Sequence, residues 1–323
     1  MRDAFVKTIQ SLAEGDERVM LIVGDLGFGV VDHFSETLPA QFLNAGVAEQ
    51  NMTGIAAGLA MSGHIVYTYS IANFPVLRCL EQIRNDVCYH NADVKVVSVG
   101  AGVAYGSLGP SHHATEDLAV MRALPNMTVF TPGDPLEAEW ATRMACMTPG
   151  PAYLRLGRAG ETRVHEADTT FELGKAHLMA DGPDATLLTA GSGLPDVMKA
   201  AALLEASGIN CRVLSFPSIK PLDTDAIRAA SLETGAIFTI EEHSVVGGFG
   251  SAVAEYLADE GAVPPIFQRL GFPNSFTSKV GDQAYLRAWY GIDAEGLARS
   301  VTERLMRGGA WGSSTASQAA SGS

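Results

Sequence analysis

Residues 42–63 read FLNAGVAEQNMTGIAAGLAMSG, an apolar start followed by a long run of small residues. The segment QFLNAGV, which begins one residue earlier, is typical of a buried strand, and the small residues after Glu49 are typical of a packed helix. Gly63 is a suitable residue just beyond the end of that helix. The segment therefore predicts one strand followed at once by one helix.

Glu49 stands at the start of this helix, and its role has two interpretations. An acidic residue in a first turn complements the helix dipole, which would make Glu49 structural. Alternatively, the glycines and alanines of the helix let neighbouring backbones approach closely, so that the carboxyl group is partly desolvated. Desolvation favours the protonated form of a carboxyl group, and a Glu that shares a proton can hydrogen-bond a ring nitrogen.

Strand-like and helix-like segments alternate along the rest of the chain in the same way. Strands are predicted at 19–24, 41–47, 64–70, 94–102, 126–132, 151–157, 184–192, 210–216, 236–242 and 265–271. Helices are predicted at 3–14, 49–62, 76–90, 136–146, 194–207, 223–234, 251–260 and 294–306. Apolar strands separated by helices indicate parallel sheets that are covered on both faces.

The predicted fold class is therefore α/β, with two domains that each contain a parallel sheet. The first domain is expected at 1–160 and the second at 181–308. Residues 161–180 are polar and show no long periodic segment, which predicts a linker. Residues 309–323 are small and polar, which predicts a disordered tail.

Composition excludes several classes of partner. The net charge of −14 repels phosphate backbones, so a nucleic-acid partner is not expected. No apolar run reaches the length of about 18 residues that a membrane span needs. The N-terminal residues mix charges into an amphipathic pattern, unlike a signal peptide. The four cysteines form no CxxC pair, which fits a reducing cytoplasm.

Two histidines, His112 and His113, follow a Gly-Pro turn after the predicted strand 94–102. The carboxyl ends of strands in α/β sheets are where ligands bind. Adjacent side chains diverge, so at most one of the two is expected to face a given site. No GxSxG sequence provides a serine nucleophile. His243 lies beside Glu241 and Glu242, but neighbouring strand residues point to opposite faces and make a poor set of metal ligands.

Several of these segments occur together in a familiar order. They are GDL at 24–26, GVAEQNM at 46–52, YSIANF at 69–74, EQIRNDV at 81–87 and GPSHHATEDLAVMRALPNMTVFTPGDPLEA at 109–138. In type and order they resemble the C-terminal half of a transketolase, and the resemblance covers about residues 1–308. It implies a pyrimidine-binding domain with a parallel sheet, followed by a transketolase C-terminal domain whose sheet is mixed.

The resemblance implies a site for thiamine diphosphate. Glu49 falls on the family's Glu that contacts N1′ of the aminopyrimidine, where a shared proton activates the cofactor. Asp25 and Leu26 match the segment near the thiazolium. The family also stacks an aromatic side chain on the pyrimidine, and Phe74 is the candidate, with Tyr69 as a fallback. A core aromatic is the structural alternative for Phe74.

Substrate-contacting residues are implied in the same way. His112 aligns with the substrate-facing histidine of the family. Arg155, with Arg158 as its neighbour, falls near an arginine that binds substrate phosphate, and Arg2 falls near another. An exposed salt bridge is the alternative for each arginine. A second substrate histidine of the family falls on Gly100, so the substrate contacts are not fully reproduced.

The chain lacks the GDG motif with which the family holds Mg²⁺ and the diphosphate. The resemblance therefore implies a split transketolase, in which a separate N-terminal-half subunit supplies the Mg²⁺ and diphosphate site. The expected assembly is α₂β₂, and the expected reaction transfers a two-carbon ketol unit from a ketose to an aldose, as sugars or sugar phosphates. Three alternatives stay open: a beta subunit of a 2-oxoacid dehydrogenase, a half-chain similar to deoxyxylulose-phosphate synthase, and a non-catalytic scaffold.

Overall fold

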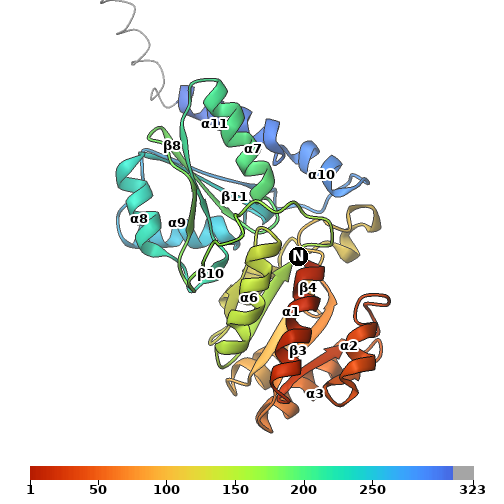
Figure 1. Cartoon of the computed structure of the whole chain (residues 1–323). Helices are drawn as coiled ribbons and strands as arrows, with labels where there is room; N and C mark the ends of the chain where they lie inside the picture. The colour runs from red at the N-terminus through yellow and green to blue at the C-terminus, as the bar shows by residue number, and fades with distance from the viewer. Residues whose placement is uncertain (308–323) are drawn as a thin grey trace, which may run out of the picture.

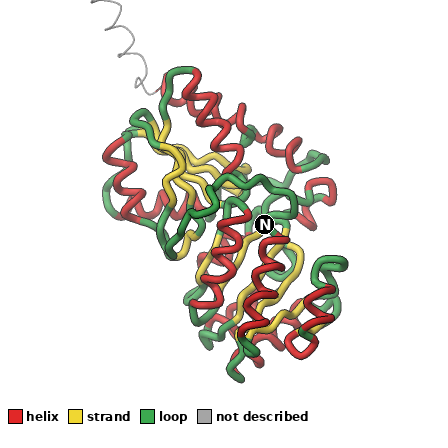
Figure 2. Tube along the Cα trace, in the orientation of Figure 1, coloured by secondary structure: helices red, strands yellow, loops and turns green. Residues whose placement is uncertain are grey.

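The computed structural model describes residues 1–307, which form two β-sheets with helices on both faces of each (Figures 1 and 2). The strands are β1 (Val19–Val23), β2 (Phe42–Asn44), β3 (Ile65–Ile71), β4 (Val94–Val99), β5 (Thr128–Phe130), β6 (Ala152–Leu156), β7 (His177–Ala180), β8 (Ala185–Ala190), β9 (Cys211–Ser215), β10 (Ser218–Lys220), β11 (Ala236–Ser244) and β12 (Ile266–Phe272).

The helices begin and end close to the predicted positions where the hydrophobic pattern is long. They are α1 (Arg2–Gly15), α2 (Asp32–Thr37), α3 (Glu49–Met61), α4 (Leu80–Gln82), which continues as a π-helical segment (Ile83–Cys88), α5 (Asp117–Ala123), α6 (Pro135–Met147), α7 (Leu194–Ala206), α8 (Thr224–Glu233), α9 (Phe249–Asp259), α10 (Gln283–Tyr290) and α11 (Ala294–Arg307). The predicted tail, 309–323, lies outside the described residues.

The first sheet has the strand order β10-β5-β6-β4-β3-β1-β2. Its strands are parallel except β10, which runs antiparallel to β5. The second sheet has the order β12-β11-β8-β9-β7, and only β7 is antiparallel to its neighbour. These sheets confirm the predicted α/β class, including the mixed second sheet.

Two strands depart from the prediction. β7 occupies the last four residues of the predicted linker 161–180, so these residues belong to the second sheet instead of a connection. β10 lies between β9 and α8 in the sequence, yet it pairs with β5 of the first sheet. Both strands are too short to give a periodic pattern. Because β10 comes from the second half of the chain, its pairing with β5 joins the two halves through backbone hydrogen bonds.

Three hydrophobic cores hold the layers together. One core lies between the first sheet and helices α1 and α6, which pack side by side (Figure 1). A second lies beneath α3, α5 and the π-helical segment, and it continues without a break to α8 and α9 of the second domain. The third lies between the second sheet and helices α7 and α11. The shared core makes the two domains one packed unit.

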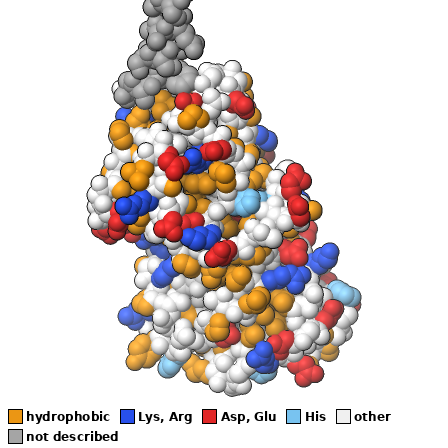
Figure 3. Space-filling model, turned by 60° about the vertical axis from the view of Figure 1, so that its left-hand side comes forward, with side chains coloured by type: hydrophobic (Ala, Val, Ile, Leu, Met, Phe, Trp, Pro, Cys, Tyr) orange, Lys and Arg blue, Asp and Glu red, His pale blue; other side chains and the backbone are white. Residues whose placement is uncertain are grey.

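Surface charges contribute much less than these cores. On the face drawn in Figure 3, acidic and basic side chains lie interspersed. Arg212 pairs with Asp181 at 2.8 Å, and Lys175 pairs with Asp225 at 3.0 Å. Exposed pairs of this kind contribute at most about 1 kcal/mol each. The stability of the fold therefore comes mainly from the buried layers and the domain junction.

The domain junction contains a buried acid, Glu137 of α6. Its carboxylate accepts hydrogen bonds from the Ser215 hydroxyl and the Gly133 amide, each at 2.6 Å, and lies 3.3 Å from Nε2 of His165. Burial raises the pKa of Glu137 to about 7, although His165 and the two hydrogen bonds oppose the rise. The folded protein therefore holds a proton that the unfolded chain releases near pH 4.5.

Glu137 is expected to make the free energy of unfolding pH-dependent. Between pH 4.5 and about 7 the folded state binds the extra proton, so stability falls as the pH rises through this range. Glu137→Gln stays neutral, so its stability relative to the natural protein should increase by roughly 3 kcal/mol across the same range. Urea unfolding at about pH 5 and about pH 8 measures the difference. Parallel pH profiles for the two proteins would show that the acid ionises normally.

Candidate active site

Glu49 lies in the first turn of α3, at the carboxyl edge of the first sheet. Only 2% of its surface is exposed. Gly24, directly after β1, borders the side chain, since a Cβ built on Gly24 would lie in ordinary van der Waals contact with Cγ of Glu49, at 3.5 Å. The expected burial of Glu49 is therefore found. The expected reason for it is not, because Gly54 and Gly58 of α3 are exposed and no other part of the described chain lies within 4 Å of a Cβ built on either.

Arg78 is the ion-pair partner of Glu49 within the described residues. Nη1 of Arg78 lies 2.7 Å from Oε2 of Glu49. The same guanidinium lies over the ring of Phe74, with Cζ 5.1 Å from the ring centre, a cation–π contact. Its side chain is 49% exposed, so it covers Glu49 from the solvent side. Sequence reasoning did not identify Arg78, because no local pattern in the segment following β3 points to its contact with Glu49.

The loop that carries Asp25 and Leu26 is fixed by Asn44 at the end of β2. The Asp25 amide donates to Oδ1 of Asn44 at 3.1 Å, and Nδ2 of Asn44 donates to Oδ1 of Asp25 at 2.9 Å. Oδ1 of Asn44 also accepts from the Gly46 amide at 2.9 Å. Asp25 has a φ of +57°, which these bonds hold in place. The structure thus brings Asp25 to the same edge of the sheet as Glu49.

His112 lies in the loop between β4 and α5, within a 3₁₀ turn. Its ring meets Phe74 edge-on at 5.2 Å and lies 6.3 Å from the ring of Tyr105. Nδ1 of His112 lies 3.0 Å from the Ser111 hydroxyl. His113, in contrast, is buried, and its Nε2 contacts the Gly106 carbonyl at 3.1 Å. As expected for adjacent side chains, the two histidines diverge, and His112 is the one beside Phe74.

Two predicted site residues lie elsewhere. Tyr69 is buried, and its ring stacks on Phe5 with the centres 5.9 Å apart, so this fallback belongs to the core. The structure also contradicts the prediction for Arg155, which is 1% exposed and forms an ion pair with Asp117 at 2.7 Å. Position 155 lies inside the buried strand β6, so its side chain cannot reach a substrate.

Arg158, the neighbour that was considered with Arg155, is the exposed arginine. Nη1 of Arg158 donates to the Ala104 carbonyl at 3.1 Å, and the guanidinium lies 4.9 Å from the ring centre of Tyr105. The amide of Arg2 donates to the Arg158 carbonyl at 2.9 Å, which places the two residues side by side. The Arg2 side chain pairs with Asp3 at 2.9 Å.

A groove runs between the two domains next to this arginine pair. Its walls include Tyr105, Arg158, Ser192, Lys199 and Gln283. The loop from β4 to α5 forms one side, and α7 and α10 form the other. The groove is open to solvent, and both polar and apolar side chains line it.

Residues 1–307 provide neither a metal-binding cluster nor a membrane-spanning helix. They contain no group of three or more His, Cys, Asp or Glu side chains close enough to hold a metal ion. In the same residues, no helix combines the length and the apolar character that crossing a membrane requires.

Comparison with known proteins decides the family. The model of the transketolase pyrimidine-binding domain matches residues 1–160, and that of the transketolase C-terminal domain matches residues 174–297. The chain belongs to the transketolase family. It is a transketolase half-chain, a transferase component that acts together with a partner subunit.

Two relatives and one solved structure match this transketolase half-chain over nearly their whole length. It is 40% identical over 304 residues to an apulose-4-phosphate transketolase subunit of Phocaeicola vulgatus, covering 94% of this chain and 96% of the relative. It is 36% identical over 308 residues to a 6-deoxy-6-sulfo-D-fructose transketolase subunit of a Clostridium species, covering 94% and 95%. A solved split-gene transketolase, described as an inactive beta4 tetramer, superposes with a TM-score of 0.85 at 37% identity, covering 94% and 97%.

Proposed function

We propose that this chain is the subunit of a thiamine diphosphate-dependent transketolase that supplies Glu49 to the pyrimidine end of the cofactor. A second polypeptide would complete the active site, and the complex would transfer a two-carbon ketol unit from a ketose to an aldose. The observation that carries the proposal is the burial of the Glu49 carboxylate beside Gly24 and Arg78, whose guanidinium lies over Phe74, at the sheet edge where α/β folds bind ligands.

The residues around Glu49 fit an aminopyrimidine ring. The family match rests on the whole first domain, and the local chemistry agrees with it. Glu49 offers a carboxylate that can hold a proton at a ring nitrogen, and Phe74 offers a partly exposed aromatic ring. The buried Ser70 hydroxyl has no hydrogen-bond partner within residues 1–307 and borders Gly24, so a polar ring edge could satisfy it.

Each residue then has a distinct task. Glu49 would hold the proton at the pyrimidine nitrogen, and Arg78 would keep the carboxylate oriented toward it. Phe74 would support the ring, and the loop of Asp25 and Leu26, fixed by Asn44, would border the cofactor. When bound, thiamine diphosphate supplies the nucleophilic carbon that attacks the ketose carbonyl.

Four exposed apolar side chains support a partner subunit on this side of the molecule. Phe28, Val47, Leu77 and Leu108 lie in the loops that follow β1, β2, β3 and β4, and their exposed fractions run from 44% to 77%. We call these four residues the apolar rim. Large contiguous apolar patches mark interaction surfaces, and the four loops that carry these side chains lie at one edge of the sheet. We assign the rim to the subunit that carries the GDG motif, which would also supply the Mg²⁺ ligands, in an α₂β₂ assembly.

Substrate binding would fall to the groove side of the site. His112 would contact the sugar, and Arg2 would bind a phosphate or another anionic group, together with Arg158, which takes the place predicted for Arg155. A guanidinium can bind a phosphate through two hydrogen bonds. The four cysteines are all free thiols, which fits an enzyme of the reducing cytoplasm.

Reconstitution tests this function. The chain is produced together with a transketolase N-terminal-half chain from the same organism, and two-carbon transfer is measured with ketoses such as D-xylulose and D-xylulose 5-phosphate. The proposal predicts ketol transfer that requires both chains, thiamine diphosphate and Mg²⁺. A complex that transfers no ketol unit from any ketose, but acylates a lipoyl domain from a 2-oxoacid, would identify a 2-oxoacid dehydrogenase instead.

A further inference from the structure

We propose that Glu242, a residue of the C-terminal domain, is a positioning residue that fixes the loop Gly100–Ala114 at the substrate groove. This loop carries Tyr105 and His112. The catalytic consequence of this role rests on the proposed function, whereas the contact itself is a property of the isolated chain.

Glu242 is a buried carboxylate near the end of β11. Oε1 of Glu242 accepts from the Val103 amide at 2.8 Å and from Nε2 of Gln283 at 2.9 Å. Oε2 of Glu242 accepts from the Ser192 hydroxyl at 3.1 Å and forms an ion pair with Arg287. Ser192, Gln283 and Arg287 all belong to the C-terminal domain. Among these contacts of the carboxylate, the bond to Val103 is therefore the one that reaches the first domain.

The loop is built around this contact. Gly102 has a φ of +61°, and a Cβ added to it would lie 2.5 Å from the Glu242 carboxylate, so the close approach depends on glycine. The Gly102 and Ala114 amides donate to each other's carbonyls at 3.2 Å and 2.8 Å, which closes the base of the loop. A displacement of Glu242 would therefore act directly on the base of the loop.

The C-terminal end of the loop, at Ala114, is connected to Glu242 as well. Nη2 of the buried Arg155 donates to the Ala114 carbonyl at 2.8 Å and to the Glu242 main-chain carbonyl at 3.0 Å. Glu242 thus reaches one end of the loop through its carboxylate and the other through Arg155. Between these two ends, Ser107 and Leu108 are exposed to solvent. The base of the loop is thus held at both ends, and Tyr105 and His112 lie between them.

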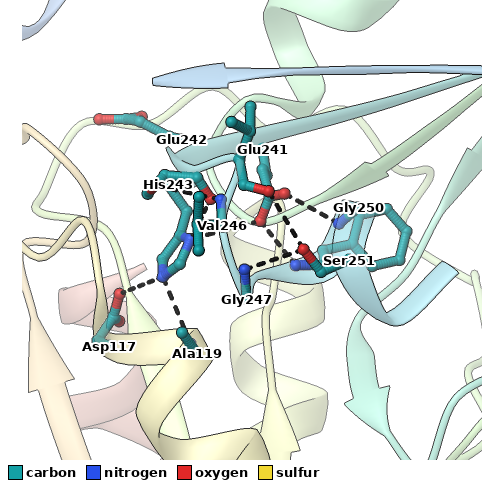
Figure 4. A network of polar contacts seen from close by, with 12 residues as sticks. Asp117, Ala119, Glu241, Glu242, His243, Val246, Gly247, Gly250 and Ser251 are labelled. Atoms are coloured by element: carbon teal, nitrogen blue, oxygen red, sulfur yellow. Dashed lines mark hydrogen bonds and ion pairs between the residues drawn. The ribbon is translucent and has the colours of Figure 1, made fainter. Parts of the chain in front are cut away.

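The two residues beside Glu242 in the sequence contact other parts of the structure, and one of them, Glu241, provides a matched control. Glu241 points away from Glu242 and accepts hydrogen bonds from the Phe249 and Gly250 amides, at 2.7 Å and 2.9 Å, at the start of α9 (Figure 4). His243 faces Asp117 and the Ala119 amide on α5 (Figure 4). Glu241 is therefore a second buried carboxylate that binds backbone amides but does not touch the loop.

The experiment compares Glu242→Gln with Glu241→Gln. In Glu242→Gln the amide oxygen must face the charged Arg287, so the amide nitrogen is left toward the Val103 N–H, which loses its acceptor. Hydrogen exchange of the Val103 amide in the isolated chain should then rise about tenfold or more, since hydrogen bonds to charged groups are among the stronger ones. In Glu241→Gln the Val103 amide should exchange as in the natural protein.

Kinetics of the reconstituted complex test the consequence. With D-xylulose 5-phosphate as the donor, Glu242→Gln should raise KM several-fold, while kcat and the affinity for thiamine diphosphate should change much less. Glu241→Gln should leave all three quantities unchanged. In Gly102→Ala the added Cβ would displace the Glu242 carboxylate from the loop, so this variant should raise KM in the same way. It replaces Glu242→Gln in the experiment if that variant does not fold.

Two results would overturn the inference. If the Val103 amide exchanges at the same rate in Glu242→Gln as in the natural protein, the Glu242 carboxylate does not hold the loop. If the amide exchanges faster but KM is unchanged, Glu242 has no positioning role in substrate binding. An inactive natural complex would instead overturn the proposed function, and the exchange measurement on the isolated chain would still decide whether Glu242 holds the loop.

Discussion

Glu49→Ala is expected to lower turnover of the reconstituted complex by roughly 100-fold to 10,000-fold, the range that a positioned proton-transfer group contributes. The variant removes the carboxylate that would hold a proton at the cofactor ring. The fold should survive, because the ion-pair partner of Glu49 is the half-exposed Arg78, which can return to water. Alanine also favours the helix that begins at position 49. Steady-state assays and circular dichroism measure the two effects.

Gln50→Ala is the matched control for this experiment. Gln50 is the next residue of the same helix, but its side chain is exposed. Its replacement should leave turnover close to that of the natural complex. Association of the Glu49 variant with the partner subunit, checked by gel filtration, should also be unchanged. Near-natural turnover in Glu49→Ala would exclude Glu49 from the mechanism.

Asp117→Ala is expected to lower the free energy of unfolding by about 3–5 kcal/mol, the usual cost of removing one member of a buried ion pair. Both oxygens of Asp117 bind Arg155, at 2.7 Å and 3.2 Å, and Oδ2 also accepts from the Tyr153 hydroxyl at 2.6 Å. The variant leaves the Arg155 charge buried without a counter-ion. Urea unfolding at neutral pH measures the loss.

Two controls separate burial from charge in this prediction. Asp181→Ala removes one member of the exposed pair with Arg212 and should cost less than about 1 kcal/mol. The double variant Asp117→Leu with Arg155→Met removes both buried charges and should be more stable than Asp117→Ala alone, since no unpaired charge remains. A loss of less than about 1 kcal/mol for Asp117→Ala would contradict the account of this ion pair.

The sequence was sufficient for the fold class, because long apolar segments such as those of β4 and β8 had to be buried on both faces. The burial of Glu49 was also expected, but for the wrong reason, since Gly54 and Gly58 after it are exposed. Short elements carried no such signal. The three residues of β10 gain their place by pairing with β5, a tertiary contact that no local pattern contains.

The arginines of the candidate site also show that local sequence does not reveal tertiary contacts. Arg155 and Arg158 lie three residues apart, and the sequence did not tell which one faces solvent. The structure decides it, because Arg155 is inside β6 while Arg158 comes after the strand ends. Arg78 was missed for a related reason, since its partners, Glu49 and Phe74, come together only when α3 packs beside the segment that follows β3.

The most direct test of the shared cofactor site is a calorimetric titration of thiamine diphosphate with Mg²⁺. The account predicts weak or no binding to the isolated chain, and tight, Mg²⁺-dependent binding once the GDG-bearing subunit is added. Tight, Mg²⁺-dependent binding to the isolated chain would contradict it.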